Sequence, residues 1–439
     1  MIKYLVINNF IKLNNTNKNL KIAVIGSGIS GLSAAWLLSK KHEVTLFEEN
    51  DYVGGHSKTI SVNYDNKDYD LDVGFIVHND INYPNFVQLL NYFNIPTETS
   101  NMSFSVSVNN GEYEYSSTLP VGPFIQPSNL FKKKFLKMIF EIPKFYFFAK
   151  KFDFRLTKKN IILDEFLKLG NFSKFYSYDH LFPMASAIWS QPINKVMKFD
   201  AESFVKFYES HGLLRFSKRP KWKIIKGGSI RYIEKILNNF SGKLILNANI
   251  SSISRRNNQI KIIRQKEFFF DQVVFAIHPE KILKLLNDCS EDELSLLKKF
   301  KSEKNLCFVH SDEELMPKRE RAWSSWNYFS DKSRGIDSKV FVTYWLNKLQ
   351  NINSNHNFLL TLNPVKEPSS KKIFTQFEFS HPIYSVETVN AQTRIQAIQG
   401  NNNTWFCGAW NGFGFHEDGL CSGIKIAEAF GCKVPWVKN

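Results

Sequence analysis

The segment KIAVIGSGISG, residues 21–31, decides the fold of this 439-residue chain. It begins with a β-rich apolar run and continues into glycines at the spacing GxGxxG, and helix formers follow over residues 32–38. A strand, a glycine turn and a helix in this order are typical of a dinucleotide-binding unit. In such a unit Gly26 permits the tight turn, Gly28 lets backbone approach a pyrophosphate, and Gly31 lets the helix pack closely on the sheet.

Two further features favour a dinucleotide site over a glycine turn that binds nothing. Ser27, Ile29 and Ser30 complete the turn at the helix start, where unpaired N–H groups and the positive end of the helix dipole suit phosphates. Glu48 ends a second apolar run, at about the twenty-residue offset that a ribose-binding acid requires. Its carboxylate can accept hydrogen bonds from both ribose hydroxyls, and its charge repels a 2′-phosphate.

Glycine-rich segments elsewhere favour FAD over NAD. The pair Gly54-Gly55 follows the ribose acid and lets a further loop lie against an extended dinucleotide. Near the C-terminus, a strand-like run leads into Gly408, and Asp418-Gly419 precedes a predicted helix over residues 420–430. A second helix start of this kind suits the ribityl and phosphate groups of a flavin.

With these segments in place, the chain resembles the flavin amine oxidase superfamily, which includes protoporphyrinogen oxidase and the carotenoid desaturases. More narrowly, it is similar to bacterial FAD-binding proteins that are encoded beside, or fused to, cyclopropane fatty acid synthases. The resemblance rests on DVGFIVHNDINYPN (72–85), NMSFSV (101–106), PMASAIWS (183–190), HGLL (211–214), RPKWKIIKGGS (219–229), SSWNYF (324–329) and TWFCGAWNGFGFHEDGL (404–420). It extends from about residue 21 nearly to the C-terminus, so it implies the fold and the cofactor but not the substrate.

The resemblance also implies which residues hold the cofactor. The first glycine segment and Glu48 would hold the ADP half, and Gly54, Gly55 and His56 the pyrophosphate side. Amine oxidases usually have arginine after this glycine pair, and a neutral His56 would give a hydrogen bond in place of a fixed charge. The other implied contacts are adenine at Ile250, the isoalloxazine edge at Gly74 and Phe75, and closure of the site by Gly408, Asp418 and Gly419.

The predicted fold class is α/β, with a discontinuous Rossmann-like FAD-binding domain and a substrate domain of a mixed sheet plus helices. The flavin-site segments lie far apart in the sequence, and the chain is too long for one simple core. We predict an FAD-binding domain over 20–80, 211–280 and 396–439, a substrate domain over 81–210 and 281–395, and an N-terminal extension over 1–19. The many aromatic residues of the substrate domain form either an apolar tunnel above the flavin or a plain core.

Composition limits the partners and the location. The chain is 43% hydrophobic and lacks the run of about 18 apolar residues that a membrane-spanning helix needs, so we expect a soluble globular protein. Its first twenty residues do not resemble a secretory signal, and five scattered cysteines have no metal-ligand spacing. We therefore predict a cytoplasmic protein without a metal. The net charge of +16 is spread along the chain without a nucleic-acid-binding module, so no nucleic-acid partner is predicted.

One basic and aromatic stretch has two interpretations. In KKKFLKMIFEIPKFYFFAKKFDFRLTKK, residues 132–159, lysines are interspersed with phenylalanines. Such a stretch suits the headgroup region of an anionic bilayer and would give peripheral membrane contact. In the second interpretation the phenylalanines line the interior while the lysines form a solvated face. We expect Pro143 to interrupt any long amphipathic helix here, which favours the second interpretation.

Few side chains can be assigned to chemistry, because the flavin supplies the electron acceptor and the protein orients the substrate. His416 and Glu417 are the predicted catalytic residues, as an acid and base beside the flavin. The alternative is that they bind the cofactor or cap the following helix. His278 and His381 are weaker candidates. No lysine of the kind used in amine oxidation can be assigned to a motif, which weakens the amine oxidase interpretation.

The sequence therefore predicts an FAD-dependent oxidoreductase, meaning an oxidase, dehydrogenase or desaturase, that acts on a hydrophobic substrate such as a fatty acyl chain. The lipid part follows from the resemblance to proteins associated with cyclopropane synthases. Three alternatives stay open. They are an amine oxidase, a non-catalytic flavin-binding partner of a lipid-modifying methyltransferase, and an NAD-linked dehydrogenase.

Overall fold

Five parallel strands form the sheet that contains the glycine segment. The computed structural model describes residues 19–118, 120–157, 161–330 and 340–436. The strand order in this sheet is β10-β2-β1-β14-β20. The bounds are β1 (Lys21–Ile25), β2 (Glu43–Phe47), β10 (Lys243–Ile245), β14 (Gln272–Phe275) and β20 (Thr404–Phe406). These strands come from three distant parts of the sequence, so the predicted discontinuous Rossmann-like fold is confirmed.

Strand β1 is buried on both faces because layers cover both sides of its sheet. Ile22 and Val24 pack with one group of helices, whereas Ala23 and Ile25 pack with a second layer. Side chains alternate between the faces of a strand, so a doubly covered strand has a continuous apolar run. The first group contains α1 (Ile29–Leu38), α2 (Pro84–Tyr92), α9 (Ile230–Asn238) and α14 (His416–Ala429). The second layer contains β11 (Ser252–Arg256), β12 (Gln259–Ile263), β13 (Glu267–Phe270), α10 (Pro279–Leu285), α11 (Glu291–Leu297) and α13 (Val386–Gln392).

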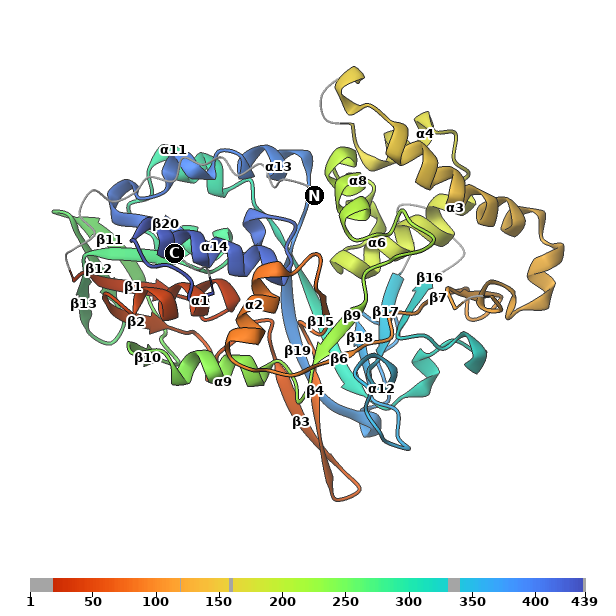
Figure 1. The fold of residues 1–439 in the computed structure, drawn as a ribbon, viewed down its shortest axis with the longest axis horizontal. Helices are drawn as coiled ribbons and strands as arrows, with labels where there is room; N and C mark the ends of the chain where they lie inside the picture. The colour runs from red at the N-terminus through yellow and green to blue at the C-terminus, as the bar shows by residue number, and fades with distance from the viewer. Residues whose placement is uncertain (1–18, 119, 158–160, 331–339, 437–439) are drawn as a thin grey trace.

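A second, mixed sheet of seven strands forms the other half of the molecule (Figure 1). Its order is β19-β15-β18-β17-β16-β7-β8, and neighbours are antiparallel except for β16 and β7. The bounds are β7 (Phe104–Val108), β8 (Tyr113–Ser116), β15 (Ser302–His310), β16 (Trp326–Ser330), β17 (Val340–Trp345), β18 (Leu359–Leu362) and β19 (Ile373–Pro382). The predicted mixed sheet is therefore confirmed.

Helices from the middle of the chain cover this seven-stranded sheet on the side that Figure 1 shows above it. Their bounds are α3 (Lys133–Lys151), α4 (Leu163–Leu169), α5 (Lys174–Tyr176), α6 (Phe182–Trp189), α7 (Ile193–Val196) and α8 (Ala201–Ser210). Their inward side chains share one core with the sheet, in which Phe135, Phe166 and Phe182 are fully buried. A short α12 (Leu346–Leu349) follows β17.

The prediction that Pro143 interrupts the helix in the basic and aromatic stretch is wrong. Helix α3 continues through Pro143 from Lys133 to Lys151. A proline inside a helix costs about 3 kcal/mol. Phe135, Met138 and Phe145 are fully buried on both sides of the proline, and burial of such side chains contributes about 1.5–3 kcal/mol each. Tertiary packing therefore outweighs the local preference.

Two small sheets connect the halves. They are the hairpin of β3 (Thr59–Tyr64) and β4 (Lys67–Asp72), and a sheet of β5 (His78–Asn79), β9 (Trp222–Ile225) and β6 (Thr97–Thr99). Asp72, at the end of the hairpin, accepts hydrogen bonds from Thr59 Oγ1 and from Ser229 N and Oγ at the start of α9. Its backbone also pairs with the side chain of Gln350. Asp72 thus fixes the loop that follows it between the two large sheets.

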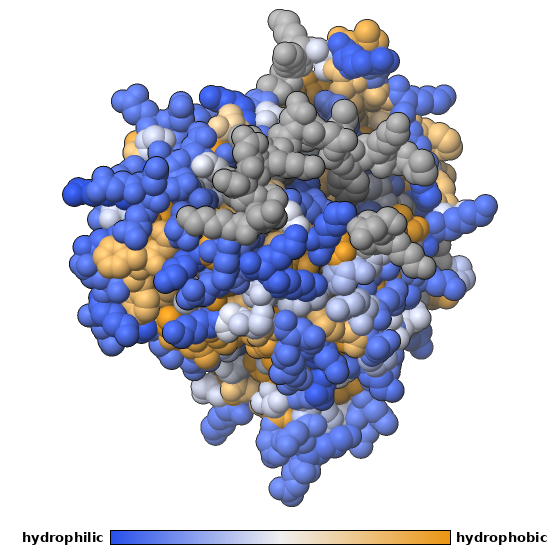
Figure 2. Space-filling model, turned by 60° about the vertical axis from the view of Figure 1, so that its left-hand side comes forward, coloured by the Kyte–Doolittle hydropathy of each residue, from blue (hydrophilic) through white to orange (hydrophobic). Residues whose placement is uncertain are grey.

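The domain boundaries stay a prediction. Helix α2 packs with α1 and α14, whereas the predicted substrate domain includes residues 81–210. The predicted N-terminal extension, except residue 19, lies outside the described residues, as do residues 158 and 159 of the basic and aromatic stretch. Among the described helices, none is both long and apolar enough to cross a bilayer. The face in Figure 2 is largely hydrophilic, with smaller hydrophobic groups between the polar side chains.

Candidate dinucleotide and substrate site

The glycine turn between β1 and α1 forms an open cradle. Gly26 has a φ of +99°, a conformation that favours glycine. A Cβ on Gly31 would lie 1.9 Å from Gly26 O, so only glycine lets α1 lie this close to the turn. Gly28 is different, because its φ of −61° suits any residue and a Cβ there would meet no protein atom within 4 Å. Gly28 therefore faces open space in which a pyrophosphate can approach the backbone.

The start of α1 is available for a ligand. In the described structure no side chain caps this helix, and the first N–H groups of a helix have no partner within it. Ile29 and Ser30, in the first turn, line the same cavity as Gly28. Free N–H groups and the positive end of the helix dipole together favour an anionic group such as a phosphate.

Glu48 lies at the carboxyl end of β2, beside this cradle. Its carboxylate accepts four hydrogen bonds of 2.5–2.9 Å, from the backbone and side chain of Ser27 and from the backbone and side chain of Asn50. The two backbone donors fix the carboxylate, whereas the two side-chain donors can rotate away. Ribose hydroxyls can replace those side-chain donors, so the geometry fits the predicted role. Ile250 lies near the same end of the cavity, because Ala248 N donates to Glu48 O.

The second glycine pair lies directly against the first. Gly54 N donates to Ser27 O at 3.1 Å, and Gly28 and Gly54 form an isolated bridge. Gly55 has a φ of +58°, and a Cβ on it would lie 3.2 Å from Gly28 Cα. Two glycine loops therefore share one wall of the cavity, as the extended-dinucleotide interpretation requires.

Helix α14 closes the cavity from the C-terminal part of the chain, and Figure 1 shows it beside α1. A Cβ on Gly419 would lie 2.8 Å from Ile29 Cγ2, so this glycine allows the two helix starts to approach. Asp418 accepts hydrogen bonds from Phe413 N and Phe415 N and shapes the loop before the helix. Burial raises the pKa of Asp418 to about 7. Gly408 lines the cavity directly.

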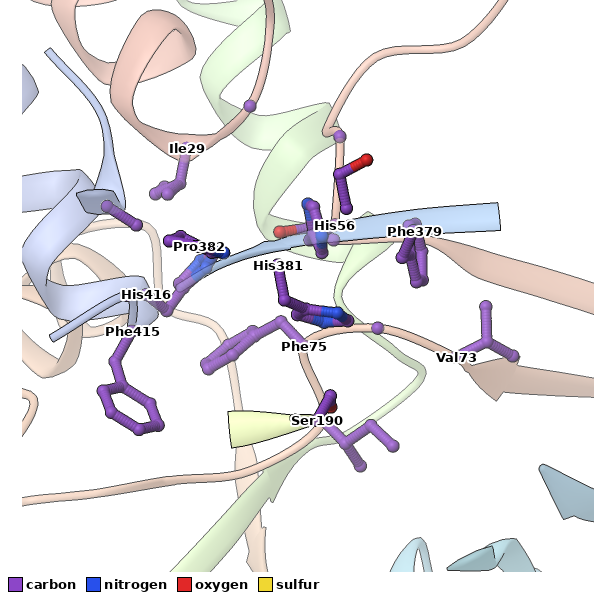
Figure 3. A pocket seen from close by; sticks show the side chains of 18 of the residues that line it. Ile29, His56, Val73, Phe75, Ser190, Phe379, His381, Pro382, Phe415 and His416 are labelled. Atoms are coloured by element: carbon purple, nitrogen blue, oxygen red, sulfur yellow. The ribbon is translucent and has the colours of Figure 1, made fainter. Parts of the chain in front are cut away.

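One cavity of about 1380 Å³ extends from this cradle to the seven-stranded sheet. Its far part, here called the apolar chamber, is lined by Phe104, Met184, Ile188, Trp326, Leu360 and Leu362. Between the cradle and the chamber, Figure 3 shows the side chains of His56, Phe75 and His381 in the same space. The cavity therefore joins a phosphate-binding end to a hydrophobic end.

Of the histidines that line the cavity, His56, His278 and His381 lie close together. His56 stacks on Phe379, with ring centroids 4.5 Å apart, and contacts His381 edge-on at 5.2 Å. Burial lowers the pKa of His56 and His278 to about 4 and that of His381 to about 3. At neutral pH all three are uncharged, so each offers one N–H donor and one acceptor.

The proton of His381 has a defined position. Leu306 N donates to Asn363 Oδ1, which identifies the other terminal atom of this side chain as the nitrogen Nδ2. Asn363 Nδ2 in turn donates to Asn305 Oδ1. Asn305 Nδ2 then donates to His381 Nδ1 at 2.8 Å. Since Nδ1 accepts, the proton of neutral His381 lies on Nε2. A buried polar chain, anchored to the backbone, thus presents an oriented N–H donor on a residue that lines the cavity.

The predicted acid–base pair of His416 and Glu417 is not formed. Helix α14 begins at His416, earlier than predicted, so both residues lie in its first turn. His416 does line the cavity, but its ring stacks on Phe75 at 3.7 Å and its Nε2 lies 3.0 Å from Tyr232 Oη. Burial lowers the pKa of His416. It therefore stays neutral and is held by packing.

Glu417 has a structural position. It does not line the cavity, and its carboxylate accepts hydrogen bonds of 2.9 Å from Asn85 N, Asn85 Nδ2 and Phe86 N. These donors belong to the first turn of α2, so Glu417 caps that helix from α14. Glu417 therefore caps a helix, as one interpretation expects, but the capped helix is α2 and not α14, which contains Glu417.

Most of the predicted cofactor residues line the one cavity. These are Gly26, Ser27, Gly28, Ile29, Ser30, Glu48, Gly54, Gly55, His56, Gly74, Phe75, Ile250 and Gly408. Gly31, Asp418 and Gly419 lie behind this lining and allow close packing or shape the loop. Sequence reasoning missed Asn305, Asn363 and Phe379. The signal for Phe379 was its two-residue offset from His381, which puts both on one face of β19. Among the described residues, no cluster of His, Cys, Asp or Glu could hold a metal ion.

Comparisons with known sequences agree with this geometry. A model of the NAD(P)-binding Rossmann-like domain matches residues 24–93. L-amino-acid oxidase of Mus musculus is 24% identical over 306 residues, which cover 62% of this chain and 41% of that protein. A 4,4′-diapophytoene desaturase of Staphylococcus aureus is 35% identical over 81 residues, 16% of either protein. The chain thus spans less than half of the length of these curated relatives.

Solved structures share the fold over nearly the whole chain. A fatty acid isomerase from P. acnes, which produces CLA, superposes with a TM-score of 0.65 at 17% identity, over 94% of this chain and 98% of that one. Putrescine oxidase bound to putrescine gives 0.65 at 13% identity, over 94% and 98%. Cyclohexylamine oxidase from Brevibacterium oxydans gives 0.63 at 13% identity, over 94% and 99%. These structural likenesses confirm the predicted fold, and the sequence comparisons confirm the resemblance to an amino-acid oxidase and a desaturase.

Proposed function

We propose that the chain is an FAD-dependent oxidoreductase that acts on a hydrophobic substrate such as a fatty acyl chain. The observation that carries this proposal is the single cavity of about 1380 Å³ that joins the glycine cradle to the apolar chamber. Sites for one small ligand usually measure about 300–1,000 Å³. The larger volume supports a cofactor and a substrate bound side by side.

The cradle end fits FAD. A Cβ on Gly28 would occupy the space that a pyrophosphate needs, and the start of α1 has no side-chain cap. Gly28, Ile29 and Gly55 would hold the pyrophosphate, Glu48 the ribose, and Ile250 would lie near the adenine. When bound, the flavin supplies the acceptor for a hydride. The chain's own residues bind, orient and exclude water.

The charges around the cavity favour a fatty acyl substrate over an amine. Among the residues that line it, the acidic ones are Glu48 and Glu49, both at the cradle end. Arg219 and Lys221 also line it. An alkylammonium in the apolar chamber would therefore lack a carboxylate partner, and an unpaired charge in such a place is strongly unfavourable. A neutral chain, or one that ends in a carboxylate, meets no such penalty.

His381 would orient the bound molecules. Its Nε2–H is fixed by Asn305, and its pKa of about 3 keeps the ring neutral at physiological pH. It therefore donates a hydrogen bond to an acceptor atom in the cavity and does not act as a charged acid. Ser380 and Pro382, on either side of it in β19, also line the cavity.

Location and partners belong to the same proposal. We place the protein in the cytoplasm, with contact at a membrane surface, because the five cysteines are free thiols and the proposed substrate is a lipid. A non-catalytic flavin-binding partner of a lipid methyltransferase remains the second candidate, since the same cavity would hold FAD and lipid without turnover. An absence of flavin reduction by any bound lipid would favour it.

Anaerobic reduction of the FAD-loaded protein tests the proposal. Unsaturated fatty acids are expected to bleach the flavin absorbance, whereas putrescine and cyclohexylamine are not. The variant Met184→Trp fills the apolar chamber, so it should keep the flavin and lose reduction by long chains. Phe269→Trp, at a half-exposed site on β13 outside the cavity, is the matched control and should behave like the parent. Reduction by amines and not by lipids would overturn the proposal.

A further inference from the structure

Helix α3 presents an unusual stripe to solvent. Lys133, Lys137, Phe140, Lys144, Phe147 and Lys151 are all exposed and follow each other at offsets of four, three, four, three and four. Residues at this spacing lie on one face of a helix. Phe140 and Phe147 are 74% and 64% exposed, whereas Phe135 and Phe145 on the opposite face are fully buried. The inner face therefore has the buried phenylalanines of the second interpretation, and the outer face has the exposed rings and lysines that the first interpretation requires.

The stripe carries positive charge that no carboxylate in the described part of the chain neutralises. Helix α3 contains six lysines and one acidic residue, Glu141. Glu141 is buried, and its carboxylate accepts hydrogen bonds from Ser173 on the inner side. Among the described residues, no carboxylate pairs with Lys133, Lys137 or Lys151. Exposed aromatic rings between lysines that have no carboxylate partner are the combination that suits an anionic lipid headgroup region.

Further apolar side chains are exposed in the segment before the helix begins. Phe131 is 87% exposed and Val121 is 64% exposed, in the segment that leads into α3. Large apolar side chains that gather on one surface usually mark a binding site. In Figure 1, α3 lies at the outer edge of the molecule, far from the five-stranded sheet.

The loop of residues 215–221 links α3 to the cavity, through Tyr146 at the buried side of the helix. The ring of Phe216, 66% exposed, packs on Tyr146 of α3 with centroids 4.9 Å apart. Arg219 Nη2 donates to the Tyr146 hydroxyl at 3.3 Å. Arg219 and Lys221 line the cavity. One loop, residues 215–221, therefore contacts α3 on one side and borders the cavity on the other.

We propose that the outer stripe of α3, together with Phe131 and Phe216, docks on the surface of an anionic bilayer, and that an apolar substrate passes from the bilayer beside Arg219 into the cavity. A second copy of the chain fits this surface poorly, because the unpaired lysines would face each other in a protein of net charge +16. The docking step stands on its own. The passage of substrate rests on the proposed function.

Co-sedimentation with vesicles at low salt tests the docking step. Vesicles of phosphatidylcholine with phosphatidylglycerol should carry down the protein, and vesicles of phosphatidylcholine alone should not. The double variant Phe140→Ser/Phe147→Ser removes two exposed rings without touching the core, so the apparent vesicle affinity should fall about tenfold or more. Phe269→Ser, on the distant β13, is the matched control and should bind like the parent.

Equal recovery with both kinds of vesicle, or full binding by the double variant, would overturn the docking step. So would a parent protein that dimerises in solution when the double variant is monomeric, because a second copy would then cover the surface. Flavin content is read from the same samples, so a colourless protein that still binds vesicles refutes the proposed function and leaves docking intact.

For the passage of substrate, the double variant should be reduced more slowly by vesicle-bound fatty acid and at the parent rate by detergent-dispersed fatty acid. Equal rates with vesicles would refute the passage.

Discussion

Replacement of Gly28 by alanine separates cofactor binding from folding. The φ of Gly28 is −61°, which alanine adopts readily, and the added Cβ would meet no protein atom within 4 Å. That empty space is where we place the pyrophosphate of FAD. The new methyl group therefore displaces the ligand and leaves the protein unstrained.

The expected magnitudes follow from the local geometry. Alanine in place of glycine at a compatible φ stabilises a protein by about 0.4–1 kcal/mol through the unfolded chain. Alanine at a helix N-cap, the position of Gly28, is worse than glycine by roughly 0.5–1 kcal/mol. These terms nearly cancel, so Tm without FAD should change by no more than about 2–4 °C. A methyl group forced against a closely packed ligand costs about 1–3 kcal/mol, which lowers the affinity about 5- to 160-fold.

The assay is titration of the apoprotein with FAD, followed by flavin fluorescence, together with thermal unfolding of parent and variant. Gly31→Ala is the contrasting variant, since its Cβ would lie 1.9 Å from Gly26 O and the fold itself should fail. If Gly28→Ala binds FAD as tightly as the parent, the pyrophosphate does not lie on this backbone, and the placement of the cofactor is refuted.

Three other predictions concern Glu417, the buried histidines and Asn305. Glu417→Gln should lower the free energy of unfolding, measured with denaturant, by about 1–3 kcal/mol and leave flavin reduction unchanged. Loss of reduction without loss of stability would instead support a catalytic role for Glu417. Burial lowers the pKa values of His56, His278 and His381 from 6.5 to about 4, 4 and 3. Between about pH 6.5 and 4 the unfolded chain therefore binds more protons than the folded protein, so Tm should decrease as the pH is lowered through this window. A constant Tm there would contradict the buried neutral rings. Asn305→Leu removes the hydrogen bond that fixes the tautomer of His381, so the anaerobic rate of flavin reduction should fall about tenfold while FAD affinity is unchanged. An unaltered rate would show that the oriented N–H does not contribute to the reaction.

Local sequence signals predicted the cradle because its geometry is encoded within a few residues. The spacing of Gly26, Gly28 and Gly31 specifies a turn, an open backbone and a close helix, and the structure has all three. Glu48 lies at the end of the next strand, where the length of one strand–helix–strand unit places it. Such short-range rules need no knowledge of the rest of the fold.

Contacts between distant segments could not be predicted in this way. The hydrogen bond between Asn85 and Glu417 joins residues 332 positions apart. Asn305 and His381 are 76 positions apart and meet only because β15 and β19 pair. At Pro143 the local rule that proline ends a helix gave the wrong prediction, because three buried side chains stabilise the helix on both sides of it. The polar contacts of the site therefore depend on strand pairing, which the local sequence around each residue does not predict.

The absorption spectrum of the protein, after incubation with excess FAD and removal of the free cofactor, shows directly whether the cavity holds a flavin. We predict a yellow protein with flavin bands at about one flavin per chain, held in the cavity between the two large sheets. A protein without flavin absorbance after this treatment would contradict it.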